Sequence, residues 1–121
     1  MIGVFSLEAI MTTKKLERSD WQRYFDRVAK NLPAMRVGVS VLGMSIGVQP
    51  ETEESALIGI SYDSNDDVLV VATPNVSHQI ANPQEIHVRE KAGTLSSVEV
   101  LTADGIKQIV ELTALPSLPA S

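Results

Sequence analysis

A chain of 121 residues, 44% of them apolar, is long enough for one domain with a hydrophobic core and too short for two. It contains no cysteine, which excludes a disulfide framework and thiolate metal sites and fits a reducing, cytoplasmic location. The net charge is −5, and residues 34–121 carry four Lys or Arg against eleven Asp or Glu. This acidic balance argues against a nucleic-acid partner, because binding phosphates requires clustered cations.

The first eighteen residues are predicted to be a disordered extension of the domain. Residues 1–10 are apolar but lack the basic start and the cleavage site of a signal peptide. Met11 begins a polar stretch typical of a natural N-terminus, so an upstream mis-start is one interpretation of the ten residues before it. No segment approaches the roughly 18 apolar residues that a membrane-spanning helix needs, so no membrane contact is predicted.

An amphipathic helix is predicted after Ser19. Ser19 and Gln22 form a capping-box pattern, and Pro33 ends the segment. Charged residues fill one face, and apolar residues recur at helical spacing on the other. The apolar positions are Trp21, Tyr24, Phe25, Val28 and Leu32. We expect this helix to cover a hydrophobic surface, and its cationic face is a second candidate surface, for acidic strands of this chain or of another copy.

From Met35 onward the apolar period changes to two, which predicts β-strands. Residues 35–48 are predicted to form one long strand bent at Gly43, with a hairpin there as the alternative. Further strands are predicted in ALIGISYD, DVLVVAT, EIHVREK, TLSSVEVLT and IKQIVEL. The segment QPETEES is a predicted turn and PNVSHQIANPQ a predicted loop. Residues 113–121, with two prolines and no charge, are predicted to form a flexible tail.

These elements predict a mainly β (α+β) fold with a single globular domain over residues 19–112. The N-terminal amphipathic helix is expected to pack on a small, strongly bent antiparallel sheet or barrel of about five to six strands. The sequence contains no alternating strand–helix pattern, no P-loop and no nucleophile-elbow motif.

The segment YDSNDDV, residues 62–68, raises the question of a metal site. Asp63, Asn65 and Asp67 match the first three ligand positions of an EF-hand calcium loop. Val68 then occupies the position that requires glycine, and Pro74 the position that requires a bidentate glutamate. We therefore predict a hairpin turn between two strands, and no metal or other cofactor.

Both histidines lie in the segment SHQIANPQEIHVRE. His78 and His87 could in principle bind zinc with Asp66 or Asp67, but their spacing across a proline loop is no recognised ligand spacing. We expect His78 to fix its loop by hydrogen bonds and His87 to lie on the outer face of a strand. The candidate contacts for a ligand or partner in this segment are His78, Asn82, His87 and Arg89.

Four segments together resemble one family of small bacterial and archaeal proteins: W..YFD, GISYD..DDVLVVAT, SHQI.NPQEIHV and SSVEV...DGIKQIVEL. The family is known only as a domain of unknown function. The resemblance covers roughly residues 19–112; it implies a single small domain and transfers no activity. A weaker similarity, at the level of the fold, is to Sm-like and SH3-like small barrels.

The predicted function is a non-catalytic binding or interaction module with a protein partner or a second copy of the chain. The sequence predicts a well-folded domain but contains no complete catalytic or cofactor motif, so we do not expect an enzyme. One alternative is an Sm-like nucleic-acid binder, although the acidic β region holds a single aromatic residue, Tyr62. The other is a small metal-dependent enzyme that uses His78 with nearby aspartates. No class of small molecule is indicated.

Overall fold

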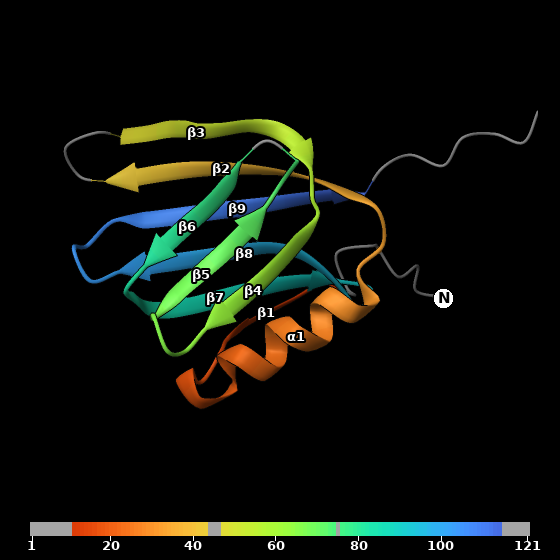
Figure 1. Cartoon of the computed structure of the whole chain (residues 1–121), viewed down its shortest axis with the longest axis horizontal. Coiled ribbons are helices and arrows are strands. Elements are labelled where there is room, and N and C mark those ends of the chain that lie inside the picture. Colours follow the sequence, from red (N-terminus) through yellow and green to blue (C-terminus); the bar gives the residue numbers. More distant parts are fainter. Residues whose placement is uncertain (1–10, 44–46, 75, 115–121) are drawn as a thin grey trace, which may run out of the picture.

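The computed structural model describes residues 11–43, 47–74 and 76–114. In this part the chain forms one α-helix, α1 (Trp21–Asn31), after a short 3₁₀ turn, η2 (Arg18–Asp20), and nine strands (Figure 1). In chain order the strands are β1 (Met11–Lys15), β2 (Met35–Gly43), β3 (Gly47–Ala56), β4 (Gly59–Asp63), β5 (Val68–Ala72), β6 (Ser77–Ala81), β7 (Pro83–Lys91), β8 (Thr94–Thr102) and β9 (Lys107–Ala114).

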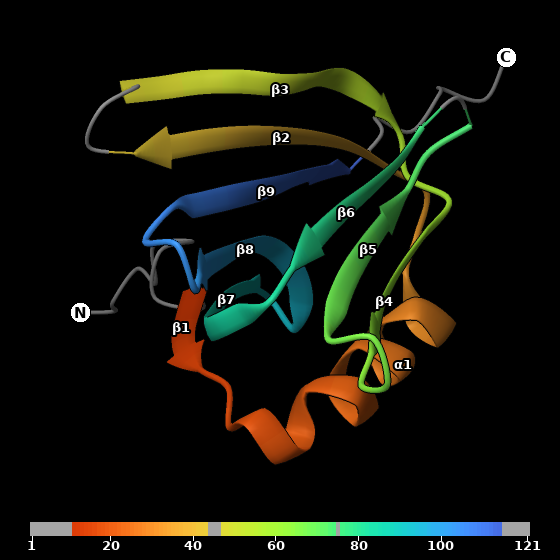
Figure 2. The ribbon, with the colours of Figure 1, turned by 60° about the vertical axis from the view of Figure 1, so that its left-hand side comes forward.

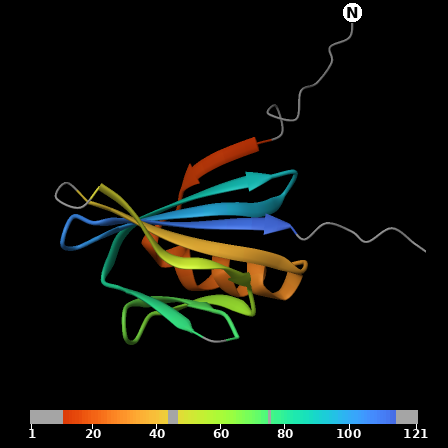
Figure 3. The same cartoon turned by 90° about the horizontal axis from the view of Figure 1, so that it is seen from above.

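The strands form two antiparallel sheets. The larger sheet has the order β1-β7-β8-β9-β2-β3, and the smaller one has the order β4-β5-β6. Helix α1 and the smaller sheet lie on the same face of the larger sheet (Figure 3). The mainly β fold with one N-terminal helix is thus confirmed, but as two open sheets in the described residues, with more strands than expected and without barrel closure.

The N-terminal segment belongs to the fold from Met11 onward. Strand β1 pairs with β7 from Met11↔Lys91 to Lys15↔His87, and Leu16 is buried. This differs from the disordered extension predicted for residues 1–18, of which residues 1–10 lie outside the described part. A short strand that pairs with a segment far along the chain leaves little signal in the local sequence.

The C-terminal boundary is also later than predicted. Strand β9 continues to Ala114, two residues past the predicted end of the domain, and pairs with β2 there. The rest of the predicted tail, residues 115–121, lies outside the described part.

The segment predicted as one long bent strand forms the alternative, a hairpin. Strands β2 and β3 pair antiparallel up to Gly43↔Gly47. Strand β3 also takes in all of QPETEES, which was predicted to be a turn. Likewise β6 lies within the predicted loop PNVSHQIANPQ. Both predictions were wrong because pairing with a neighbouring strand outweighs the weak β propensity of these polar segments.

Helix α1 buries the predicted face but begins differently. Trp21, Tyr24 and Phe25 are buried, and Pro33 follows the helix after Leu32. The helix starts through η2, with Asp20 as the N-cap and no side-chain capping bond, so the capping box predicted at Ser19 does not form. Gln22 instead accepts a hydrogen bond from the Ser64 hydroxyl at 3.0 Å, which holds the helix to the β4–β5 turn. In the described part, no helix is long and apolar enough to span a membrane.

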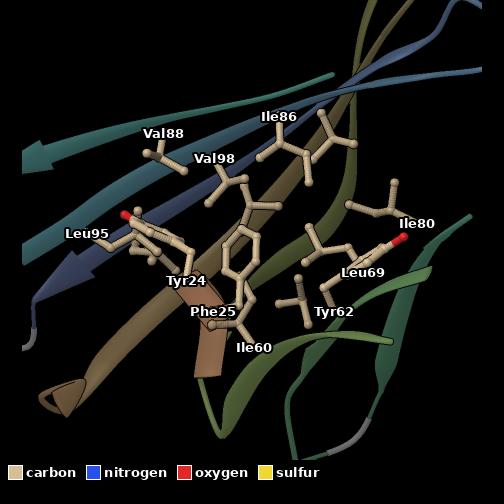
Figure 4. Packing of buried hydrophobic residues seen from close by; sticks show 14 of the residues in the cluster. Tyr24, Phe25, Ile60, Tyr62, Leu69, Ile80, Ile86, Val88, Leu95 and Val98 are labelled. Atoms are coloured by element: carbon tan, nitrogen blue, oxygen red, sulfur yellow. The ribbon is translucent and has the colours of Figure 1, made fainter. Parts of the chain in front are cut away.

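The hydrophobic core lies between the larger sheet and the layer made by α1 and the smaller sheet. The ring of Phe25 lies among apolar side chains of both sheets (Figure 4). Trp21 and Tyr62 pack edge to face with ring centroids 5.2 Å apart, and so do Tyr24 and Phe25. The Trp21–Tyr62 pair joins the helix to β4 more strongly than burial alone, whereas Tyr24 and Phe25 are neighbours within the helix.

The predicted hairpin at YDSNDDV is confirmed. Strands β4 and β5 pair up to Asp63↔Val68. One carboxylate oxygen of Asp63 accepts hydrogen bonds from the backbone N–H groups of Asn65, at 2.9 Å, and Asp66, at 3.3 Å. Asp67 has a positive φ of 52° and accepts the Tyr62 hydroxyl at 2.6 Å. The acidic residues therefore shape the turn with their own side chains.

Candidate functional site

The four residues predicted as contacts do not form one site. His78 and Asn82 lie at the ends of β6, and both connect to the β8–β9 hairpin. The His78 Nε2 atom is 2.8 Å from Oε1 of Gln108. The Asn82 backbone N–H donates to the Asp67 carbonyl at 2.9 Å, and its carbonyl accepts from the Ala103 N–H at 3.1 Å. His78 is thus fixed by a hydrogen bond as predicted, although it lies on strand β6 and not in a loop.

A hollow of about 310 Å³ lies beside Asn82 and Gln108, next to the β8–β9 turn. The polar groups of Thr102 and Asp104 bond within the turn. The Thr102 hydroxyl contacts the Asp104 carboxylate and lies 2.9 Å from the Ile106 carbonyl. The hydroxyl of Thr102 lowers the pKa of Asp104. These contacts shape the turn, and Gln108 is bonded to His78.

His87 and Arg89 lie on the face of the larger sheet that is turned away from the core. Ile86 and Val88 point into the core, while the half-buried His87 and the exposed Arg89 point outward, as predicted for His87. His87 is level with Lys15 on one neighbouring strand and with Glu99 on the other. The larger sheet therefore separates the two histidines, and the described residues include no group of three His, Cys, Asp or Glu that could hold a metal.

A basic groove between β1 and α1 is the strongest candidate site, because it gathers cations from both elements. We call it the β1–α1 groove; it has a volume of about 480 Å³. Figure 2 shows β1 leading directly into the turn that starts the helix, so one short segment supplies both walls. Its charged lining residues are Lys14, Lys15, Arg23 and Arg27, with Glu17 and Asp20.

The buried ring of Tyr24 forms the base of the β1–α1 groove. The Lys14 ammonium and the Arg27 guanidinium each lie 5.4 Å from the ring centroid, within cation–π range. The Tyr24 hydroxyl donates to Glu90 at 2.5 Å. Burial and then this bond to Glu90 raise the pKa of Tyr24 far above its usual value. Tyr24 is therefore a neutral, fixed platform that positions two cations.

Arg23 is paired with Asp20, but the other cations of the groove are only weakly neutralised. Lys14 and Glu90 are 3.8 Å apart, and so are Lys15 and Glu85, which is at the outer limit of an ion pair. Arg27 makes no ion pair with the part of the chain that the structure describes, and its side chain is exposed. Exposed ion pairs contribute little because water screens them. The groove therefore presents cations that an anionic partner can bind.

Charge is unevenly divided over the whole fold. Residues 11–43, which include β1 and α1, carry seven Lys or Arg and three Asp or Glu. Residues 47–114 carry three Lys or Arg and eleven Asp or Glu. The β1–α1 groove is thus a positive site on a negative molecule.

The sequence by itself indicated only half of this site. It identified the cationic face of the helix but placed Lys14 and Lys15 in an extension outside the domain. The available signal was the run of basic residues immediately before a helix with Arg23 and Arg27 four residues apart. That signal does not show that β1 joins the sheet, and the groove exists only because it does.

Comparison with known proteins supports the resemblance drawn from the sequence. The model of DUF5335, a family of unknown function, matches residues 12–121 and so includes most of β1. A protein of Aquifex aeolicus (strain VF5), described as an uncharacterized protein, is 38% identical over 110 residues. The similarity covers 90% of this chain and 99% of that protein.

Proposed function

This chain belongs to the DUF5335 family of unknown function, and we propose that it is a non-catalytic module that binds an acidic segment of a partner protein. The observation that carries the proposal is the β1–α1 groove, where four cations outnumber two acids on a molecule with a net charge of −5. A concentrated positive site on a negative protein attracts an acidic partner to that site and repels it elsewhere.

The groove has the chemistry of a binding surface. Two of its cations, Lys14 and Arg27, lie over the ring of Tyr24, and this tyrosine keeps its proton. Side chains of this kind attract carboxylates and set the orientation of a bound segment. Because the contacts are exposed, the affinity should fall as salt is added.

Single-stranded RNA is the alternative anionic ligand. RNA binders of this size combine cations with exposed aromatic rings on which bases stack. Among the described residues, the aromatic rings are all buried, including Tyr24 at 3% exposure and Tyr62 at 7%. This burial favours a protein partner, and the absence of cysteine from the sequence supports a cytoplasmic one.

A charge-reversal experiment tests the proposal. The probe is a short, fluorescently labelled peptide of alternating glutamate and threonine, titrated with the full chain at low salt while anisotropy is measured. The double variant Lys14→Glu/Arg27→Glu should weaken binding by at least about tenfold, since each exposed charge contact contributes up to about 1 kcal/mol.

The matched control is Lys107→Glu, which reverses a charge on the outer face of β9, where Lys107 pairs with Glu99 at 3.3 Å. It should bind the peptide like the wild type. Equal binding by the groove variant and the wild type would overturn the proposal. Tighter binding of a mixed-sequence RNA oligonucleotide than of the peptide would replace it with the RNA alternative.

A further inference from the structure

We propose that the acidic segment binds as an extra strand on the free edge of β1. This inference rests on the proposed function and specifies how the partner is held: by backbone hydrogen bonds to β1 and by acidic side chains at alternate positions. The partner is therefore an extended acidic segment of a protein, bound without forming a helix.

The hydrogen-bond pattern shows which groups of β1 are unused. The Leu16 N–H donates to the Ile86 carbonyl at 2.9 Å. Because antiparallel pairing alternates, the even-numbered residues of β1 direct their N–H and C=O groups to β7. Those of Met11, Thr13 and Lys15 point away from the sheet. Strand β1 ends the strand order of the larger sheet, and no other described strand pairs with this edge.

The opposite edge of the larger sheet is protected against an added strand. Strand β3 contains Pro50, which has no N–H to donate, and its pairing with β2 shifts register twice. The sequence of β3 includes three glutamates and no Lys or Arg. Strand β1 has an uninterrupted register and two lysines. The two edges therefore differ in both geometry and charge, and only β1 suits an acidic strand.

Side-chain direction connects this edge to the β1–α1 groove. Lys14 points to the core side, towards the ring of Tyr24, while Lys15 is level with His87 on the outer face. A strand added to β1 presents its own side chains alternately to these two faces. Acidic residues on its core side would reach Lys14 and Arg27, so the groove selects acids at every second position.

Blocking the backbone tests this binding mode separately from charge. The alternating peptide and a fully N-methylated version have the same side chains, but the second cannot donate along either edge. The wild-type chain should bind the N-methylated peptide at least about tenfold more weakly, since a few backbone bonds of about 1 kcal/mol each are lost. Equal affinity for the two peptides, with binding still sensitive to Lys14→Glu/Arg27→Glu, would overturn the added strand and leave the proposed function intact.

The corresponding change in the protein is Thr13→Pro. It removes an N–H that faces away from β7, so the fold should be retained while peptide binding falls about tenfold. Thr13→Ala keeps that N–H and should bind like the wild type. A thermal melt of each variant checks the fold, and unchanged binding by a folded Thr13→Pro chain would contradict the proposal.

Amide exchange provides a second measurement on the unmodified chain. Adding the alternating peptide should slow hydrogen exchange at the Thr13 and Lys15 amides, because they become hydrogen-bonded. The Lys14 amide, already directed to β7, serves as the internal control. Protection of Thr13 and Lys15 without peptide that is lost on dilution to a monomer would identify a second copy as the occupant and overturn the acidic partner.

Discussion

Arg18 connects the N-terminal segment to both sheets. Its guanidinium lies 4.4 Å from the Trp21 ring centroid, 3.5 Å from a carboxylate oxygen of Asp67, and donates to the Pro83 carbonyl at 2.9 Å. Asp67 belongs to the turn of the smaller sheet, and Pro83 starts β7 of the larger one. Arginine suits this position because its planar, multiply donating group can stack and bond at the same time.

Tyr24 makes stability depend on pH in the alkaline range. Burial, followed by the bond to Glu90, raises its pKa above the usual value near 10. The folded state therefore holds this proton more tightly than the unfolded state, so the stabilisation is complete below about pH 10 and is lost as pH rises above it.

We expect Tyr24→Phe to reduce this loss of stability at alkaline pH, measured as the change in the urea midpoint between pH 8 and pH 11. Some loss should persist in the variant, because burial, followed by the bond to Asp67, also raises the pKa of Tyr62. Tyr24→Phe/Tyr62→Phe should therefore show the flattest profile. An identical decline in the wild type and Tyr24→Phe would contradict the interpretation.

At the scale of elements, the tight hairpins fix the register of the larger sheet. Strands β7 and β8 are joined by two residues, with Lys91 paired to Thr94. Ala92 has a φ of 52° and Gly93 a φ of 81°, the left-handed conformation of a two-residue hairpin turn. Glycine adopts this conformation freely, whereas alanine is strained by its Cβ.

Ala92→Asn should therefore stabilise the protein by about 0.5–1 kcal/mol, since asparagine tolerates a positive φ better than alanine. Equilibrium urea unfolding measures the gain. The matched control is Ala103→Asn in the next hairpin, where alanine does not have a positive φ, and no comparable gain is expected. A destabilising Ala92→Asn change would show that the turn is not strained.

At the scale of the whole molecule, one core holds both sheets and the helix together. The fully buried Phe25, Leu69 and Val98 come from α1, β5 and β8 and belong to a single cluster. Because α1 and the smaller sheet share this core with the larger sheet, we expect the two sheets to unfold together.

Phe25→Ala should lower the free energy of unfolding by about 3–5 kcal/mol, as is typical for removing a buried aromatic ring. Trp21 fluorescence reports on the helix and the smaller sheet, and far-ultraviolet circular dichroism reports on all strands. The two signals should have the same midpoint in the wild type and in the variant. Phe25→Leu, which keeps most of the apolar volume, should lower the free energy of unfolding by less than Phe25→Ala. Separate midpoints for the two signals would contradict a shared core.

Local patterns in the sequence predicted a large part of this structure. The helical stripe of Trp21, Tyr24 and Phe25, the β4–β5 turn at Asp63 and the bounds of β8 all follow from spacing and turn chemistry between near neighbours. Three of the four edge strands did not follow, because β1, β3 and β6 are polar segments that are strands only through their partners.

The sequence by itself determined the mainly β fold, the amphipathic helix, the turns and the imbalance of charge, because each depends on residue type and short-range spacing. Only the tertiary structure decided that the strands divide into two sheets, that His78 and His87 lie on opposite sides of the larger one, and that Lys14 and Arg27 share a groove over Tyr24. The physical reason is that pairing β1 with β7 joins residues far apart in the chain, and the site is built on that pairing.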